Sequence, residues 1–162
     1  MNPVTQEIAA TAARIVVEEG LEYGPAKRRA VKQLGLPSRA ELPGNDTLEE
    51  AVFEYLSLFC ADTQPTELRA LRELAAVWML RLAEFRPHLS GAVWRGTATR
   101  LNDIHLQLYC DDSKSAEIQL LSKGVEYDVS SAPGPRGVPV DRLSMTVDCE
   151  ALGEPIGLHL TI

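Results

Sequence analysis

The sequence predicts an α+β fold in which N-terminal helices pack on a small mixed β-sheet. From residue 5 to residue 85, apolar residues recur every three or four positions, which is the period of helices with one buried face. After Pro87 they alternate with polar residues, which is the period of a strand with one buried face. This change divides the chain into a helical region, 1–86, and a sheet-forming region, 87–162. No long linker separates the two regions, so we expect one compact unit.

The helical region is expected to contain helices at residues 5–19, 26–34, 46–59 and 65–85. Gly20 and Gly35 end the first two, because glycine readily takes the left-handed conformation that follows a helix. Asp46 is placed to cap the third helix. The fourth ends at Arg86, since the residue before a proline disfavours the helical conformation. Arg72 is expected to face water from the fourth helix.

The sheet-forming region is expected to contain an apolar run at 89–93, strands at 104–110, 125–129, 142–149 and 156–162, and a helix at 113–122. Residues 130–139 are rich in Gly and Pro and predict a loop. The last two strands are separated by a short turn, which predicts an antiparallel hairpin. In the final strand His159 lies on the face opposite the apolar residues, with Gly157 and Thr161.

Composition excludes several classes of function. The chain has 162 residues, of which 45% are hydrophobic and 24% charged, as expected for a domain with its own core. A net charge of -7 argues against binding to nucleic acid or to anionic membranes, because both require a basic surface. No apolar run is as long as a membrane span. Cys60, Cys110 and Cys149 form no CxxC pair, which suits reduced thiols, so we expect a cytoplasmic protein.

One stretch carries a recognisable motif. Gly91-Ala92 is followed by Arg95-Gly96-Thr97-Ala98 and then by Asn102-Asp103-Ile104, with His105 next and Gln107 beyond it. Alternation places Asp103, His105 and Gln107 on one face of a strand. The pattern resembles the signature of the nucleotidyltransferase superfamily, the polymerase-β-like fold of minimal nucleotidyltransferases, in which Gly-Ser or Gly-Gly precedes Asp-x-Asp. The resemblance covers residues 89–162 and leaves the N-terminal helices unexplained.

The resemblance implies a nucleotide-binding site and a metal-dependent reaction. A triphosphate would lie against backbone N–H groups of the glycine turn and of the helix start that follows it. The expected nucleotide-binding residues are Gly91, Ala92, Arg95, Gly96 and Thr97. Asp103 is the expected catalytic residue, and with further carboxylates it would hold Mg²⁺ or Mn²⁺.

The motif is incomplete in this chain. Ala92 replaces the serine, His105 replaces the second acid, and the third acid has no clear match. On the last strand the equivalent polar residue is His159, with Asp148 and Glu150 on the preceding strand as alternatives. Magnesium prefers oxygen ligands, so an imidazole in place of a carboxylate removes both a charge and a suitable donor atom.

Four hypotheses therefore stay open. The favoured one is a catalytically degenerate relative that binds a nucleotide triphosphate or a protein partner. The second is an active nucleotidyltransferase that uses Asp103 with Mg²⁺ or Mn²⁺. The third is a transition-metal site for Zn, Mn or Fe formed by Asp103, His105 and His159. The fourth is an interaction protein without a ligand, which self-associates through its helical region.

Two charged clusters have simpler explanations. The run Lys27-Arg28-Arg29 is a candidate phosphate-binding face, but acidic residues just upstream favour local ion pairs. Asp111 and Asp112 are candidate metal ligands, but they directly precede a helix, where an aspartate caps the first turn. We therefore expect neither cluster to form a binding site.

Overall fold

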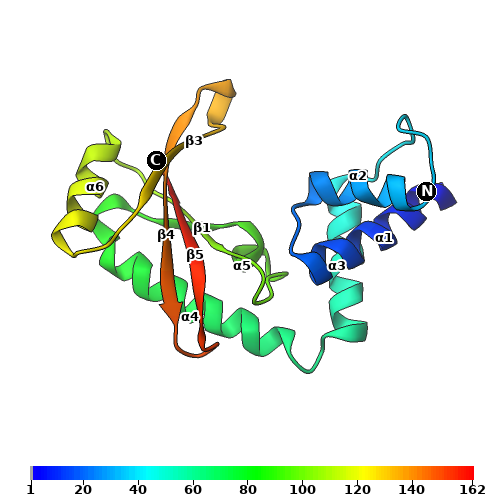
Figure 1. Ribbon diagram of the computed structural model, residues 1–162, viewed down its shortest axis with the longest axis horizontal. Coiled ribbons are helices and arrows are strands. Elements are labelled where there is room, and N and C mark those ends of the chain that lie inside the picture. Colours follow the sequence, from blue (N-terminus) through cyan, green and yellow to red (C-terminus); the bar gives the residue numbers. More distant parts are fainter. Residues whose placement is uncertain (1) are drawn as a thin grey trace. The chain divides into compact units, whose positions relative to one another are not determined.

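The computed structural model describes residues 2–162, which form two compact units divided between Thr66 and Glu67 (Figure 1). The first unit contains helices α1, Pro3–Glu19, α2, Tyr23–Gln33, and α3, Asn45–Phe59. Helix α4, Gln64–Arg81, groups with the sheet in the second unit. The structural division therefore lies in the first turn of α4, whereas the change of period follows α4. The reason is that the apolar stripe of α4 packs against the strands.

The helices of the first unit follow the expected pattern closely. Its core is formed by fully buried side chains such as Ile8 and Ile15 of α1 and Leu48 of α3. Gly20 ends α1 in the left-handed region, with φ 71°. The predicted cap at Asp46 is wrong, because α3 begins at Asn45 and its N-cap is Gly44, which has no side chain to offer.

The second unit is built on a five-stranded mixed sheet, which confirms the α+β fold class. The strands are β1, His88–Ser90, β2, Ile104–Gln107, β3, Asp128–Ala132, β4, Val140–Cys149, and β5, Glu154–Thr161, in the order β1-β2-β5-β4-β3. Strands β2 and β5 are parallel, and the other neighbouring pairs are antiparallel. The predicted hairpin of β4 and β5 is confirmed. The last strand of the chain thus lies at the centre of the sheet.

Some boundaries differ from the expected ones. The run 89–93 divides into β1 and a short helix α5, Gly91–Arg95, because Gly91 turns the chain with φ 73°. The strand expected at 125–129 forms three residues later, as β3. A 3-10 turn, η1, Ala83–Phe85, replaces the last turn of the predicted fourth helix, and a second, η2, Pro135–Gly137, lies in the loop after β3.

The two faces of the sheet differ as the alternation predicts. Buried residues such as Ile104, Leu158 and Leu143 point to one face, where they form a core with α4 and with α6, Ser113–Ser122. The other face carries a polar row, which we define by its register across all five strands: Ser90, His105, His159, Ser144 and Asp128. The polar row brings together side chains that lie far apart in the sequence.

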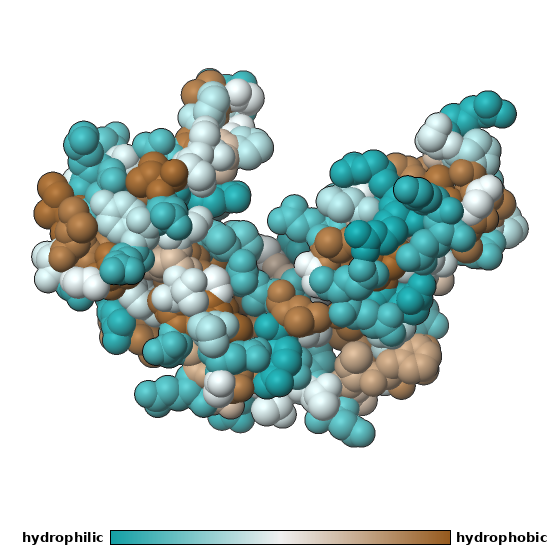
Figure 2. Space-filling view, in the orientation of Figure 1, coloured by the Kyte–Doolittle hydropathy of each residue, from teal (hydrophilic) through white to brown (hydrophobic). Residues whose placement is uncertain are grey.

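Helix α6 shows how the sheet is covered on its apolar face. Ala116 and Leu120 are buried against the core, whereas Ile118 and Leu121 are 66% and 64% exposed. Apolar surface is correspondingly visible at the position of α6 (Figure 2). Among residues 2–162, no helix combines the length and the apolar character needed to cross a lipid bilayer.

Arg72 does not simply face water from α4. Its Nε donates to the carbonyl oxygen of Val93 at 2.9 Å, and its Nη2 donates to that of Trp94 at 3.0 Å. Because α5 is short, its last carbonyl groups have no partners within the helix. Arg72 thus links the last carbonyl groups of α5 to α4.

We expect Arg72→Ala to lower the free energy of unfolding by about 1–2 kcal/mol, since hydrogen bonds to charged groups contribute more than neutral ones. Arg69→Ala is the matched control, because Arg69 on the same helix is 82% exposed and pairs with Glu73, which is itself 64% exposed. That change should cost less than about 0.5 kcal/mol. Urea denaturation followed by circular dichroism measures both. Equal losses in the two variants would contradict the anchoring role.

Candidate functional site

The structure brings Asp103, His105 and His159 together. Asp103 directly precedes β2, His105 lies in β2, and His159 lies beside it in the parallel strand β5. The Nε2 atom of His159 is 2.8 Å from Oδ2 of Asp103. The two imidazole rings stack, with 4.9 Å between their centroids and 22° between their planes. The side chains of Asp103 and His159 are 47% and 22% exposed, so solvent reaches both.

A serine extends this cluster into a chain of hydrogen bonds. Oγ of Ser144, which is opposite His159 on β4, lies 2.8 Å from Nδ1 of His159. An ionised carboxylate only accepts hydrogen bonds, so Nε2 of His159 carries the proton that faces Asp103. In the neutral ring, Nδ1 then accepts from the hydroxyl of Ser144. Sequence reasoning missed Ser144, although the strand period would place it on the face opposite Leu143.

The neighbours of Asp103 favour its charged form. The hydrogen bond from His159 lowers the pKa of this carboxyl group below its ordinary value, and partial burial opposes that effect. Electrostatic interaction with His159 and His105 lowers the pKa of Asp103 further, as does a hydrogen bond from the backbone amide of Gly157. Asp103 is therefore ionised throughout the neutral range.

This shift predicts a stability change in acid. Because the pKa of Asp103 is lower in the folded state, its contribution to stability is complete above the unfolded value of about 4 and is lost as the pH falls through the folded value. We expect Asp103→Asn to lower the free energy of unfolding by less than about 1 kcal/mol at pH 6, since the side chain is half exposed. The difference should shrink below pH 4. Urea unfolding between pH 2 and pH 6 tests this, and a constant difference would contradict it.

Two glycines border the cluster closely. A Cβ atom on Gly157 would lie 2.6 Å from Cγ and from Oδ2 of Asp103, so the carboxylate occupies the space above this glycine. A Cβ atom on Gly91 would lie 3.4 Å from Cδ2 of His105, and the φ of 73° at Gly91 also favours glycine. The glycine turn of the motif therefore lies directly against the His105 ring.

The other expected nucleotide-binding residues divide into two groups. Gly91 and Ala92 begin α5 beside His105, and the N-cap residue Ser90 makes no side-chain cap there. Its hydroxyl instead donates to the carbonyl oxygen of His105 at 3.3 Å. The amides of Gly96 and Thr97 both bond to the carbonyl oxygen of Ala92, at 2.9 and 3.0 Å. These two residues and the preceding Arg95 thus form the end of α5, away from its first N–H groups.

The residues near Asp103 do not fit a magnesium site. Mg²⁺ requires several oxygen ligands, whereas the neighbours of this single carboxylate are two imidazoles. Asp148, at the end of β4, pairs with Pro155, and Glu150 lies in the following turn, so neither belongs to the polar row. Within residues 2–162, no group of three or more His, Cys, Asp or Glu side chains is arranged to hold a metal ion.

The two charged clusters of the sequence have the local partners expected of them. In the basic run, Lys27 Nζ donates to Asn45 Oδ1 at 2.7 Å and Arg29 pairs with Glu19. Asp112 caps α6 by accepting hydrogen bonds from the amides of Lys114 and Ser115, at 3.0 and 3.2 Å. These contacts account for Lys27, Arg29 and Asp112 without a ligand.

Comparisons with known proteins add little to this geometry. No protein family and no curated protein matches the chain. Among solved structures, a cytoplasmic RNA terminal U-transferase is similar, with a TM-score of 0.40 and 15% identity. The similarity covers 59% of this chain and 30% of that one. At this level it supports no conclusion about activity.

Proposed function

We propose that this chain is a nucleotidyltransferase-like domain that binds a nucleotide without the metal-dependent reaction. The contact of Gly91 with His105 carries the proposal. In the motif, the glycine turn faces the strand that bears the acids, and here the same relation holds with a histidine in the second acidic position. The neighbouring strand adds His159 where a further acid is expected, so an imidazole pair replaces the metal-binding carboxylates.

The order of elements is consistent with this proposal. A strand leads through Gly91 into a short helix, and the next strand follows Asp103. A helix and further strands come next, as in the motif. Ser90, the N-cap residue of α5, makes no side-chain cap, so its side chain does not compete with a phosphate oxygen for the amides there. The hydrogen bond from His159 offsets the charge of Asp103, which would otherwise repel an anion.

Binding that does not depend on metal distinguishes this proposal from an active enzyme. We expect isothermal titration with ATP, GTP, CTP and UTP in EDTA to show binding of at least one of them, with a Kd on the order of 100 μM. Adding Mg²⁺ should change this Kd less than threefold and should produce no turnover. Binding that requires Mg²⁺, or release of pyrophosphate, would instead support an active nucleotidyltransferase that uses Asp103.

Gly91→Val tests the placement of the phosphate. The valine side chain would cover the His105 ring, so we expect the affinity for the triphosphate to fall at least tenfold. Gly124→Val is the matched control, because Gly124 has nearly the same φ, 72°, and open space around it. Both variants carry the same backbone strain, and thermal melts report it. Equal affinities in the two variants would contradict the proposed site. If no nucleotide binds, light scattering for self-association tests the interaction-protein hypothesis.

The hydrogen-bonded chain from Ser144 through His159 to Asp103 favours a second candidate function, acyl transfer through a serine nucleophile. A base that accepts the hydroxyl proton and a carboxylate that orients the base are the parts such a reaction needs. A fluorophosphonate probe tests it, because the probe forms a covalent bond with an activated serine. Labelling of Ser144 that is lost in His159→Asn would support this candidate. Absence of labelling would exclude it.

A further inference from the structure

A pocket of about 640 Å³ opens beyond the polar row, at the carboxyl ends of the two parallel strands. Its floor includes Gln107 of β2 and Thr161 of β5, which are register partners. Each lies two residues beyond a histidine of the polar row, His105 or His159. Since a strand rises about 3.3 Å per residue, the floor begins about 7 Å from the stacked rings. The pocket therefore adjoins the site proposed for the phosphate.

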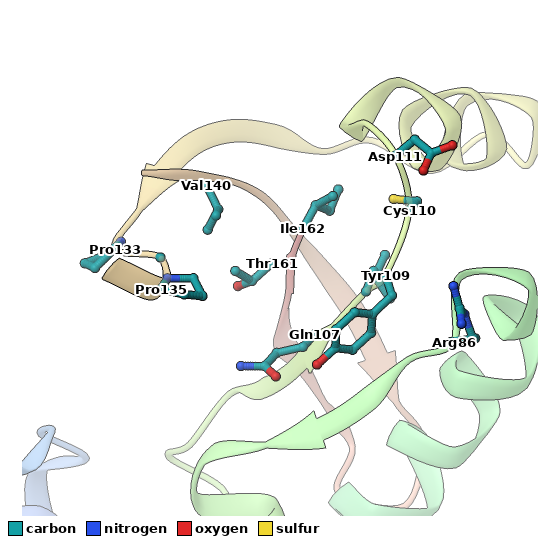
Figure 3. Close-up of a pocket in the computed structure, with 12 residues that line it drawn as sticks. Arg86, Gln107, Tyr109, Cys110, Asp111, Pro133, Pro135, Val140, Thr161 and Ile162 are labelled. Atoms are coloured by element: carbon teal, nitrogen blue, oxygen red, sulfur yellow. The ribbon is translucent and has the colours of Figure 1, made fainter. Parts of the chain in front are cut away.

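The walls of the pocket come from separate segments. Figure 3 shows Pro133 and Pro135 on one side, Tyr109 and Arg86 on the other, and Gln107 and Thr161 between them. Each wall is thus supplied by a different part of the chain. A ligand that enters between them would have the prolines on one side and the tyrosine on the other.

Both walls are held in place by local contacts. The Tyr109 amide donates to the carbonyl oxygen of Phe85 at 2.7 Å, and its ring meets the His88 ring edge-on at 5.0 Å. In the opposite loop, a Cβ atom on Gly134 would lie 2.2 Å from the carbonyl oxygen of Val138, so the loop closes tightly on itself there. The pocket is consequently formed before any ligand enters.

The chemistry of the lining selects a flat and nearly neutral ligand. Tyr109 offers an aromatic face for stacking, and the two prolines offer apolar surface on the opposite wall. The Gln107 amide and the Thr161 hydroxyl each provide both a donor and an acceptor. Arg86 and Asp111 contribute opposite charges, so the lining does not select a highly charged group such as a triphosphate. A heteroaromatic ring with donors and acceptors along its edge fits these features.

We propose that this pocket binds the base of the nucleotide whose phosphates lie at Gly91. This inference rests on the proposed function and adds the group that would distinguish one nucleotide from another. The ring stacks against Tyr109, while Gln107 and Thr161 hydrogen-bond to its edge. The sugar spans the distance from the pocket to the polar row. Discrimination among bases then depends on the Gln107 amide, because its donor and acceptor occupy separate atoms.

Free nucleosides test the pocket without the phosphate site. Adenosine, guanosine, cytidine and uridine are each titrated into the full chain, and binding is followed by ¹H–¹⁵N NMR. At least one nucleoside should shift the amide signals of Gln107, Tyr109 and Thr161. Tyr109→Ala and Gln107→Leu should each lower the affinity of the chain for that nucleoside and for its triphosphate at least tenfold. Ile118→Ala and Gln119→Leu are the matched controls on α6, and they should leave both affinities unchanged. Because the shifts are measured on the unaltered chain, the test does not depend on folding of the variants.

The outcomes separate this inference from the proposed function. If triphosphates bind but no nucleoside shifts the amide signals of the pocket residues, the proposal that the pocket binds the base is wrong. The proposal that the phosphates bind at Gly91 is then unaffected. Nucleoside affinity that is unchanged in Gln107→Leu and Tyr109→Ala would also overturn it. If nucleosides bind in the pocket but triphosphates bind no more tightly, and Gly91→Val has no effect, the phosphate site fails and the pocket survives as a nucleoside site. Failure of both ligands to bind overturns both.

Discussion

Replacing Gly157 by alanine is expected to break the hydrogen bond between Asp103 and His159. The new methyl carbon would lie 2.6 Å from the carboxylate, well inside van der Waals contact, so Asp103 must move. That movement also removes the bond from the Gly157 amide, which lowers the pKa of Asp103 in the native chain. We expect the free energy of unfolding to fall by about 1–3 kcal/mol, the usual cost of forcing an extra carbon into a packed site. Urea denaturation measures this loss, and the nitrogen chemical shifts of His159 report its tautomer.

A double-mutant cycle separates this clash from a general weakening of β5. In a chain that already carries Asp103→Ala, the carboxylate is absent and the methyl group has space. Gly157→Ala should then cost less than about 0.5 kcal/mol, because alanine itself is tolerated in a strand. An equal loss in both backgrounds would show that the clash with Asp103 is not the cause.

The second large effect is a gain of metal binding. Replacing both His105 and His159 by aspartate would place three carboxylates on adjacent strands, together with Asp103. Their repulsion should destabilise the metal-free chain by about 1–2 kcal/mol. Mn²⁺ should then bind with a Kd on the order of 100 μM. Titration followed by electron paramagnetic resonance measures free Mn²⁺ directly. Thermal melts should show stabilisation that increases with the logarithm of the metal concentration.

The control for this variant keeps the shape of the new side chains but not their charge. Replacing both histidines by asparagine supplies amide oxygens without adding carboxylates, so we expect Mn²⁺ binding at least tenfold weaker than in the aspartate variant. If the aspartate variant does not bind Mn²⁺, the positions of His105 and His159 do not correspond to those of metal-binding acids. The degenerate-nucleotidyltransferase proposal would then lose its main geometric support.

Periodicity predicted most elements because it reports which face of each element is buried. It placed His159 opposite the apolar residues of its strand and His105 opposite those of β2. It did not reveal that the two strands pair in parallel, because pairing depends on contacts between distant segments. The convergence of Asp103 with His159, which are 56 residues apart, therefore required the structure. The hydrogen bond to Ser144 depends on a register that alternation leaves open.

Local geometry explains the remaining differences. Only the resemblance implied a helix at α5, because five residues are too few to show a helical period. Its position depends on the left-handed turn at Gly91 and on the side chain of Arg72 from α4. The role of Gly157 was equally hidden, since a glycine in a strand carries no sign of the side chain that covers it.

The central place of β5 in the sheet also determines when this site forms. Strands β1 and β2 are close together in the sequence, but β5, the parallel partner of β2, follows only after α6, β3 and β4. Pairing segments so distant in the sequence is slow, because the intervening loop must first be ordered. Until β5 pairs with β2, the chain holds Asp103 and His105 without His159 beside them. The cluster therefore forms together with this non-local pairing, among the slow steps of folding.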